Sequence, residues 1–191
     1  MSRILVLSNG HGEDLSGSII ASRLIAIGNK VEALPIVGSG DAYKKDKINI
    51  IGKTRKFNTA GLGYNSLKGK LLDLFNGQII YFFSKIWLIL VIRKKYDYFL
   101  VVGDIVPIFF AWLSRKKYFT YLVAYSSHYT GKLNLPWPCK YFLKSSKAIR
   151  IYTRDTLTSI DLSDQLKKEV LFFGNPFIDK LLKNNFKDSN N

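Results

Sequence analysis

The chain has 191 residues, of which 47% are hydrophobic and 14% aromatic, which suits one globular domain with a core and excludes a disordered chain. Its 29 lysines and arginines outnumber its 14 aspartates and glutamates, and the net charge of +15 predicts an anionic partner: a phosphorylated ligand, a nucleic acid or an anionic membrane surface. The single cysteine, Cys139, excludes a disulfide framework within the chain and fits a cytoplasmic setting; we expect neither a metal nor a cofactor.

Strand and helix patterns alternate from the N-terminus onward. Residues 3–8 (RILVLS) predict a short buried strand that runs into the glycine turn NGHG. From Asp14, apolar residues at helical spacing predict a helix that Gly28 closes. Strands follow at 31–37 and 48–52, and the polar residues 53–65 read as a loop.

The most apolar part of the chain lies within a helix predicted over residues 68–92. Its segment 79–92 is interrupted by Ser84 and Lys85 and is shorter than the roughly 20 residues that a bilayer span requires, so it predicts a buried or interfacial helix. The apolar run 4–7 is too short for a signal peptide.

The second half of the chain continues the alternation. Strands are predicted at 97–103, 118–125, 148–153 and 169–174, with helices over 108–114 and 138–146 and from residues 153–155 onward; residues 126–129 read as polar loop. This order predicts the α/β class: a Rossmann-like parallel sheet with helices on both faces.

Ligands of such sheets bind at the carboxyl ends of the strands, so the polar residues that follow each predicted strand are the candidate site. They are Asn9, Gly10, His11, Gly12, Glu13, Asp14, Asp104, Ser126, His128, Arg154 and Asn175.

The turn after the first strand has two interpretations. Gly10 and Gly12 let a ligand approach the backbone, the helix start offers N–H groups to an anion, and His11 could donate to a phosphate or act as a base. Alternatively, the segment is a tight strand–helix turn that Asp14 caps. A dinucleotide fingerprint fits poorly, because the third glycine follows Gly12 by five residues rather than three.

The other candidates also have alternatives. Asp104 is placed to act as a general base on a hydroxyl, or it caps the following helix or pairs with a lysine. His128 could bind an anion or simply lie on a loop. Arg154 could hold a ligand phosphate, or it marks a helix start at which Asp155 favours the helix dipole.

Basic residues are spread along the chain, but residues 93–95 (RKK) end a helix that is apolar nearly all round. Together with Phe83 and Trp87 they predict docking to an anionic membrane, which would make the protein peripheral on the inner membrane. No RNA-recognition module or zinc finger is present in the sequence, so we do not expect nucleic acid as a partner.

Four segments together resemble one family: LSNGHGEDLSG, VGDIVPIFFAWLSRKKY, YTRDTLTSIDL and FFGNPFIDKLL, which span residues 7–182. They are similar, in the same order, to the N-terminal half of the lipid-A-disaccharide synthase-related proteins. The resemblance implies half of a GT-B glycosyltransferase, in which two Rossmann-like domains face a cleft, the first holding the acceptor and the second the nucleotide-sugar donor.

The resemblance also implies roles. Asp104 would deprotonate the acceptor hydroxyl, His11 would be the second catalytic residue, and Glu13 would position the ligand. Asp104 would stand alone, without the acidic cluster of lipid-A-disaccharide synthase itself. Residues 1–176 would form the acceptor-side domain, and 177–191 would begin an interdomain linker or be a frayed tail. The second domain would be absent, so the chain would be a truncated or split gene product, or one domain of an enzyme that another chain completes.

Two hypotheses follow. In the first, the chain is part of a glycosyltransferase that acts on a lipid-linked or phosphorylated acceptor and is inactive alone. In the second, it is a non-catalytic Rossmann-like module that binds an anionic membrane or a partner protein.

Overall fold

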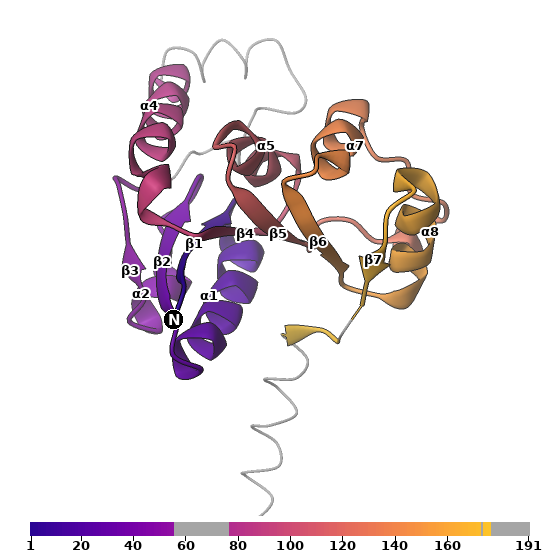
Figure 1. The fold of residues 1–191 in the computed structure, drawn as a ribbon, viewed down its shortest axis with the longest axis horizontal. Helices are drawn as coiled ribbons and strands as arrows, with labels where there is room; N and C mark the ends of the chain where they lie inside the picture. The colour runs from indigo at the N-terminus through magenta and orange to yellow at the C-terminus, as the bar shows by residue number, and fades with distance from the viewer. Residues whose placement is uncertain (56–76, 173, 177–191) are drawn as a thin grey trace, which may run out of the picture.

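The computed structural model describes residues 1–55, 77–172 and 174–176 of the chain. They form a seven-stranded parallel sheet in the order β3-β2-β1-β4-β5-β6-β7 (Figure 1). The strands are β1 (Arg3–Ser8), β2 (Lys30–Pro35), β3 (Asn49–Ile50), β4 (Tyr98–Val102), β5 (Lys117–Leu122), β6 (Ala148–Thr153) and β7 (Val170–Leu171). The α-helices are α1 (His11–Ala26), α2 (Asp41–Lys45), α4 (Gln78–Ile92), α5 (Ile105–Leu113), α6 (Ser127–Thr130), α7 (Trp137–Lys144) and α8 (Thr156–Leu166), and a 3-10 turn η1 (Arg93–Lys95) follows α4.

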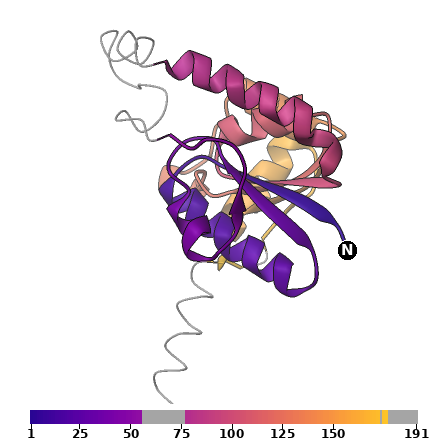
Figure 2. The same ribbon diagram turned by 90° about the vertical axis from the view of Figure 1, so that its left-hand side faces the viewer.

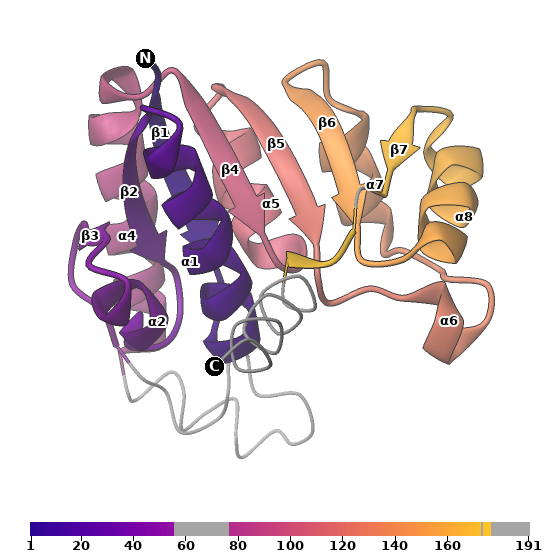
Figure 3. The ribbon, with the colours of Figure 1, turned by 90° about the horizontal axis from the view of Figure 1, so that it is seen from below.

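Helices cover both faces of the sheet. Figure 3 shows α1 and α2 in front of the strands and α4, α5 and α7 behind them, while α8 lies beside β7. Figure 2 shows α4 along the outer side of the molecule. The expected fold class, a Rossmann-like parallel sheet with helices on both faces, is therefore confirmed.

The strand sequences explain the layers. Because successive residues of a strand point to opposite faces, β1 contributes to two cores. Leu5 and Leu7 pack in a core with residues of α4, α5, α7 and α8, whereas Val6 packs in a second core with residues of α1 and α2. β4 is likewise buried over Phe99–Val102 on both faces, as is usual for a central parallel strand.

Most predicted elements are present, although several boundaries differ and two short helices were not predicted. Helix α1 begins at His11, not at Asp14. The short helix α2 lies between β2 and β3, where none was predicted, and α6 occupies the predicted polar loop at 126–129. The predicted loop at 53–65 and the first half of the predicted helix at 68–92 lie largely outside the described residues, as does the segment 177–191.

The apolar segment 79–92 forms most of α4, which has 15 residues. In the described ranges, no helix combines the length and the apolar character that crossing a membrane requires.

Candidate functional site

The strand order reverses direction between β1 and β4, because the chain first builds outward through β2 and β3 and then continues on the other side of β1. In open α/β sheets ligands bind at such a switch point, outside the carboxyl ends of the strands. Here the two strands end at Ser8 and Val102, and Asn9 and Asp104 follow. The structure therefore brings two sequence-predicted residues together from positions 95 apart.

Asn9 joins the two acidic side chains of this site. Its Nδ2 lies 3.3 and 3.2 Å from the two carboxylate oxygens of Asp104, and its backbone N–H donates to Oε2 of Glu13 at 2.9 Å. Its own Oδ1 is buried and has no hydrogen-bond partner among the described residues. A hydroxyl group of a substrate could donate the hydrogen bond that this buried oxygen lacks.

Asp104 is the N-cap of α5, since its Oδ1 accepts a hydrogen bond from the backbone N–H of Val106 at 2.9 Å. The helix-cap interpretation is thus confirmed. As a cap, Asp104 lies half-buried at the switch point and contacts Asn9. This position also allows its carboxylate to act on a bound ligand.

Glu13 projects from the first turn of α1 over Gly103, the residue that ends the β4 run. A Cβ placed on Gly103 would lie 2.3 Å from Oε2 of Glu13, and Gly103 has φ +139°, a conformation that favours glycine. The backbone at the end of β4 is therefore shaped to admit the Glu13 carboxyl.

Gly103→Ala should destabilise the fold by about 1–3 kcal/mol, because alanine is strained at this φ. The Glu13 carboxyl is the end of a flexible side chain and can move aside from the new methyl group. Urea unfolding measures the change. Gly12→Ala is the matched control: Gly12 is helical, has open space around it, and should gain about 0.5 kcal/mol. A Gly103→Ala protein as stable as the wild type would contradict this description of the site.

The electrostatics of the site couple the two acids. Burial, and then the charge of Asp104, raise the pKa of Glu13 to about 8, although the hydrogen bond from the Asn9 backbone lowers it. Burial also raises the pKa of Asp104, while hydrogen bonds from Val106 and Asn9 oppose the shift. No second acidic residue follows β4 directly, but Glu13 reaches the neighbourhood of Asp104 from α1.

Asp14 lies beneath the turn. Oγ of Ser8 donates to its Oδ1 at 2.6 Å, and the hydroxyl of Tyr43 on α2 donates to that Oγ at 2.9 Å. All three side chains are buried. The expected cap at Asp14 is wrong: the N-cap of α1 is Gly10, without a side-chain cap bond, and Asp14 links α1 to β1. His11 opens α1, and its side chain is outside the described part of the structure.

A second group of predicted residues gathers at the ends of β5 and β6. Oγ of Ser126 donates to Oδ2 of Asp155 at 2.8 Å, and the Arg154 guanidinium donates to the carbonyl of Val123 at 3.4 Å. Asp155 caps α8 through the Thr158 backbone. Burial alone would raise the pKa of Asp155, but the bonds from Thr158 and Ser126 and the nearby His128 hold it below its usual value.

Sequence reasoning missed Tyr125, which follows β5 beside this edge of the sheet. Burial and the neighbouring Cys139 and Asp104 raise its pKa, so its hydroxyl stays protonated and can donate. The prediction placed Tyr125 at the end of the strand 118–125, whereas β5 ends at Leu122 and leaves Tyr125 beyond it. Asn175 follows β7 in the short stretch 174–176. Within the described ranges, no group of three or more His, Cys, Asp or Glu side chains could hold a metal ion.

Comparisons with known proteins identify the fold. No protein-family model and no curated protein matches the sequence. Among solved structures, the chain is similar to Anabaena HepE in complex with UDP-glucose, at 12% identity and a TM-score of 0.59, over 92% of this chain and 44% of that one. It is also similar to UDP-GlcNAc 2-epimerase from Neisseria meningitidis bound to UDP-GlcNAc, at 15% identity and a TM-score of 0.57, over 97% and 50%.

A glycosyltransferase from Rickettsia africae ESF-5 is similar as well, at 15% identity and a TM-score of 0.52, over 91% of this chain and 42% of that one. The chain thus spans half or less of the length of these proteins. It has the fold of one Rossmann-like half of the GT-B glycosyltransferases and UDP-GlcNAc 2-epimerase-like enzymes.

Proposed function

We propose that the chain is the acceptor-side half of a GT-B glycosyltransferase that transfers a sugar from a nucleotide-sugar donor to a lipid-linked or phosphorylated acceptor. The observation that carries the proposal is the pair of carboxyl groups, Glu13 and Asp104, which Asn9 joins at the switch point of the sheet. The resemblance to the lipid-A-disaccharide synthase-related proteins supports the same assignment and points to a glycolipid acceptor.

Glu13 is the general base of the proposed reaction. Two adjacent carboxyl groups in a partly buried site do not both ionise readily, so they hold one proton between them near neutral pH. Asp104 receives hydrogen bonds from Val106 and Asn9, which favour its charged form. Glu13, with a pKa of about 8, is therefore the stronger base of the two.

The proposed step is an inverting displacement. The step needs Glu13 in its ionised form, whose fraction grows as the pH approaches 8. The acceptor O–H then gives its proton to the Glu13 carboxylate, the acceptor oxygen forms a bond to the anomeric carbon, and the bond from that carbon to the diphosphate breaks with its electron pair on the leaving nucleotide. Oδ1 of Asn9 can accept a hydrogen bond from a second hydroxyl of the acceptor sugar and so orient that sugar.

The nucleotide would be held mainly elsewhere. Two of the similar structures contain UDP-sugars, and more than half of the HepE chain lies outside the region that this chain covers. We assign most donor contacts to a second domain, on a longer polypeptide or a separate chain. On this side, the group formed by Ser126, His128 and Arg154 faces the same edge and supplies basic side chains for a phosphate.

The function is tested with the purified chain, alone and mixed with the product of the reading frame that follows it in the genome. UDP-GlcNAc and UDP-glucose are offered with a bacterial glycolipid extract, and products are separated by mass. Transfer that Glu13→Gln lowers by about 100-fold or more supports the proposal. Epimerised nucleotide sugar without transfer, or no turnover and no glycolipid binding, contradicts it. Vesicle binding without any turnover favours the non-catalytic alternative.

Asp104→Asn separates the two carboxyl groups by role. Asparagine is also a good N-cap, so the fold should stay within about 1 kcal/mol of the wild type. Removing the Asp104 charge should lower the pKa of Glu13 below 8, which carboxyl-carbon NMR of isotopically labelled glutamate measures directly. Transfer should persist with its pH profile moved toward acid. Complete loss of transfer would instead identify Asp104 as the base.

A further inference from the structure

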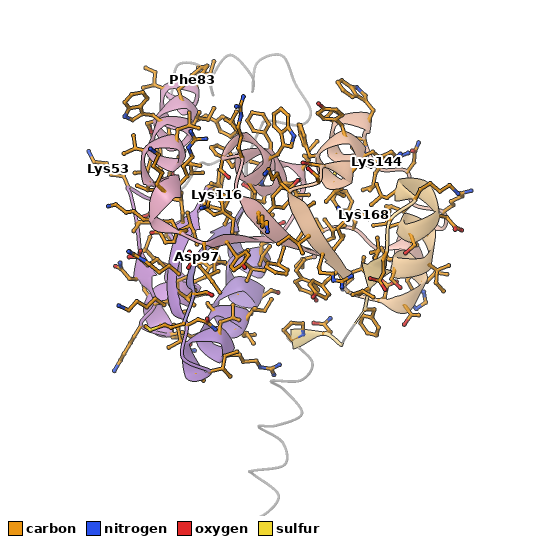
Figure 4. The ribbon with its side chains drawn as sticks, in the orientation of Figure 1. Lys53, Phe83, Asp97, Lys116, Lys144 and Lys168 are labelled. Carbon is orange, nitrogen blue, oxygen red and sulfur yellow. The ribbon has the colours of Figure 1, made fainter. Side chains whose placement is uncertain are left out.

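Helix α4 presents an apolar stripe to the outside of the molecule. Ile80, Phe83, Trp87 and Val91 follow one another at intervals of three or four residues, which places them on one side of the helix. They are 77%, 64%, 71% and 57% exposed. Figure 4 shows Phe83 near the upper end of α4.

The inner side of the same helix carries its charge. Lys85 is the sole charged residue between Gln78 and Ile92, and it is only 2% exposed; its Nζ donates to the carbonyl of Pro35 at 3.1 Å. A surface helix normally has the opposite arrangement, with charges outward and apolar residues inward. The outer face of α4 is therefore built for a partner that is apolar at its contact.

Basic residues flank the stripe at both ends. Arg93, Lys94 and Lys95 form η1 directly after α4, and the two lysines are exposed. At the other end, the hydroxyl of Tyr81 donates to the carbonyl of Lys53 at 3.3 Å, which places Lys53 beside α4 (Figure 4). The sequence has no aspartate or glutamate from residue 78 to residue 96.

Two exposed aromatic residues extend the surface. Trp137 and Tyr141 lie on α7, which covers the same face of the sheet as α4, and both are largely exposed (Figure 1). Lys144, at the end of α7, is exposed as well. Aromatic and basic side chains together are typical of the interface between lipid headgroups and hydrocarbon.

We infer that α4 docks the protein onto an anionic lipid surface, lying in the plane of the interface with its apolar stripe inserted. The 15-residue helix suits this orientation, since it is shorter than a span. The basic residues at both ends fit anionic headgroups. A second copy of the chain would bring a further charge of +15 against the same surface, so charge selects lipid over self-association. The inference does not depend on the proposed transfer reaction.

The test is sedimentation of the purified chain with vesicles of phosphatidylcholine alone or with about a quarter phosphatidylglycerol. The wild type should bind the anionic vesicles and release in about 0.5 M salt. The double variant Phe83→Ser/Trp87→Ser should bind at least about tenfold more weakly, since it removes the two largest side chains of the stripe.

The matched control is Leu157→Ser/Ile160→Ser, which removes two exposed apolar residues from α8 and should leave binding unchanged. Circular dichroism establishes that both double variants are folded. Tryptophan fluorescence gives an independent readout: it should shift to shorter wavelength on anionic vesicles, and Trp87→Phe should reduce the shift, with the remainder coming from Trp137. Equal binding by the wild type and the α4 variant, or no binding of the wild type to anionic vesicles, overturns the inference.

Discussion

Replacing Glu13 with glutamine should stabilise the fold, and the gain should grow as the pH rises. Burial and the Asp104 charge raise the pKa of Glu13 from 4.5 to about 8 in the folded protein. Between these values the folded state holds a proton that the unfolded state has lost, so the stability of the wild type falls as the pH rises through this window. Glutamine cannot ionise, and it keeps an oxygen that accepts the hydrogen bond from Asn9.

The expected gain follows from the size of the shift. The two proteins should be similarly stable near pH 4.5, and the variant should lead by on the order of 4 kcal/mol above pH 8, since each pKa unit corresponds to about 1.36 kcal/mol. Urea unfolding across the pH range measures the difference. Glu169→Gln is the control: Glu169 is exposed in a surface pair with Arg150, and its replacement should change stability by less than about 0.5 kcal/mol. A constant difference between wild type and Glu13→Gln would show that Glu13 ionises normally.

This stability effect would accompany the loss of transfer activity proposed for the same variant. A carboxyl group held in an unfavourable environment destabilises the fold, and such trade-offs mark functional sites. Glu13→Gln therefore tests the site even before an acceptor is identified.

The sequence predicted the strands of this fold well, because buried parallel strands are short, continuous apolar runs between turn residues. Arg3–Ser8 and Tyr98–Val102 are examples. The sequence-based prediction was wrong at the start of α1, because it took Asp14 as a side-chain cap. Gly10 begins that helix with φ +132° and no side-chain bond, so a search for Asp14 as the cap was misplaced by four residues.

The candidate site was predicted in its members but not in its pairing. Asn9, Glu13 and Asp104 all follow strands, and any parallel sheet brings such residues to one edge. Which of them meet depends on β1 lying beside β4, and no local pattern in the sequence specifies that neighbour. The same holds for Tyr43, which contacts Ser8 from α2. This helix has only five residues and is too short to show a helical periodicity in the sequence.

The sequence singled out Phe83 and Trp87 of α4 as an outward-facing pair, and both are exposed. The inner face was not evident from the sequence, because the helix is apolar nearly all round. The structure turns Phe82 and Ile86 inward and leaves Ile79 exposed. The inward side is marked instead by Lys85, whose long stem is buried up to its ammonium group.

Lys85→Met should stabilise the protein near neutral pH, and the gain should vanish at high pH. Burial lowers the pKa of Lys85 from 10.5 to about 8. Among the described residues, its ammonium group contacts one carbonyl, that of Pro35, and the ring of Tyr81 at 5.2 Å. The folded state therefore binds fewer protons than the unfolded state between pH 8 and 10.5, and the stability of the wild type rises across this window.

At pH 7 the cost of the buried charge is about 3 kcal/mol, and methionine, which has a similar length, removes it. The lost hydrogen bond to Pro35 offsets about 1 kcal/mol, so a net gain of about 2 kcal/mol is expected.

Lys44→Met, at an exposed lysine paired with Asp41, is the matched control and should change stability by less than about 0.5 kcal/mol. If Lys85→Met is destabilising at pH 7 by more than the hydrogen bond is worth, the ammonium group is better stabilised than its contacts indicate. Ionisation of Glu13 lowers the stability of the wild type up to about pH 8, and deprotonation of Lys85 raises it again above pH 8. The wild type should therefore have a stability minimum near pH 8, which the double variant Glu13→Gln/Lys85→Met should lack.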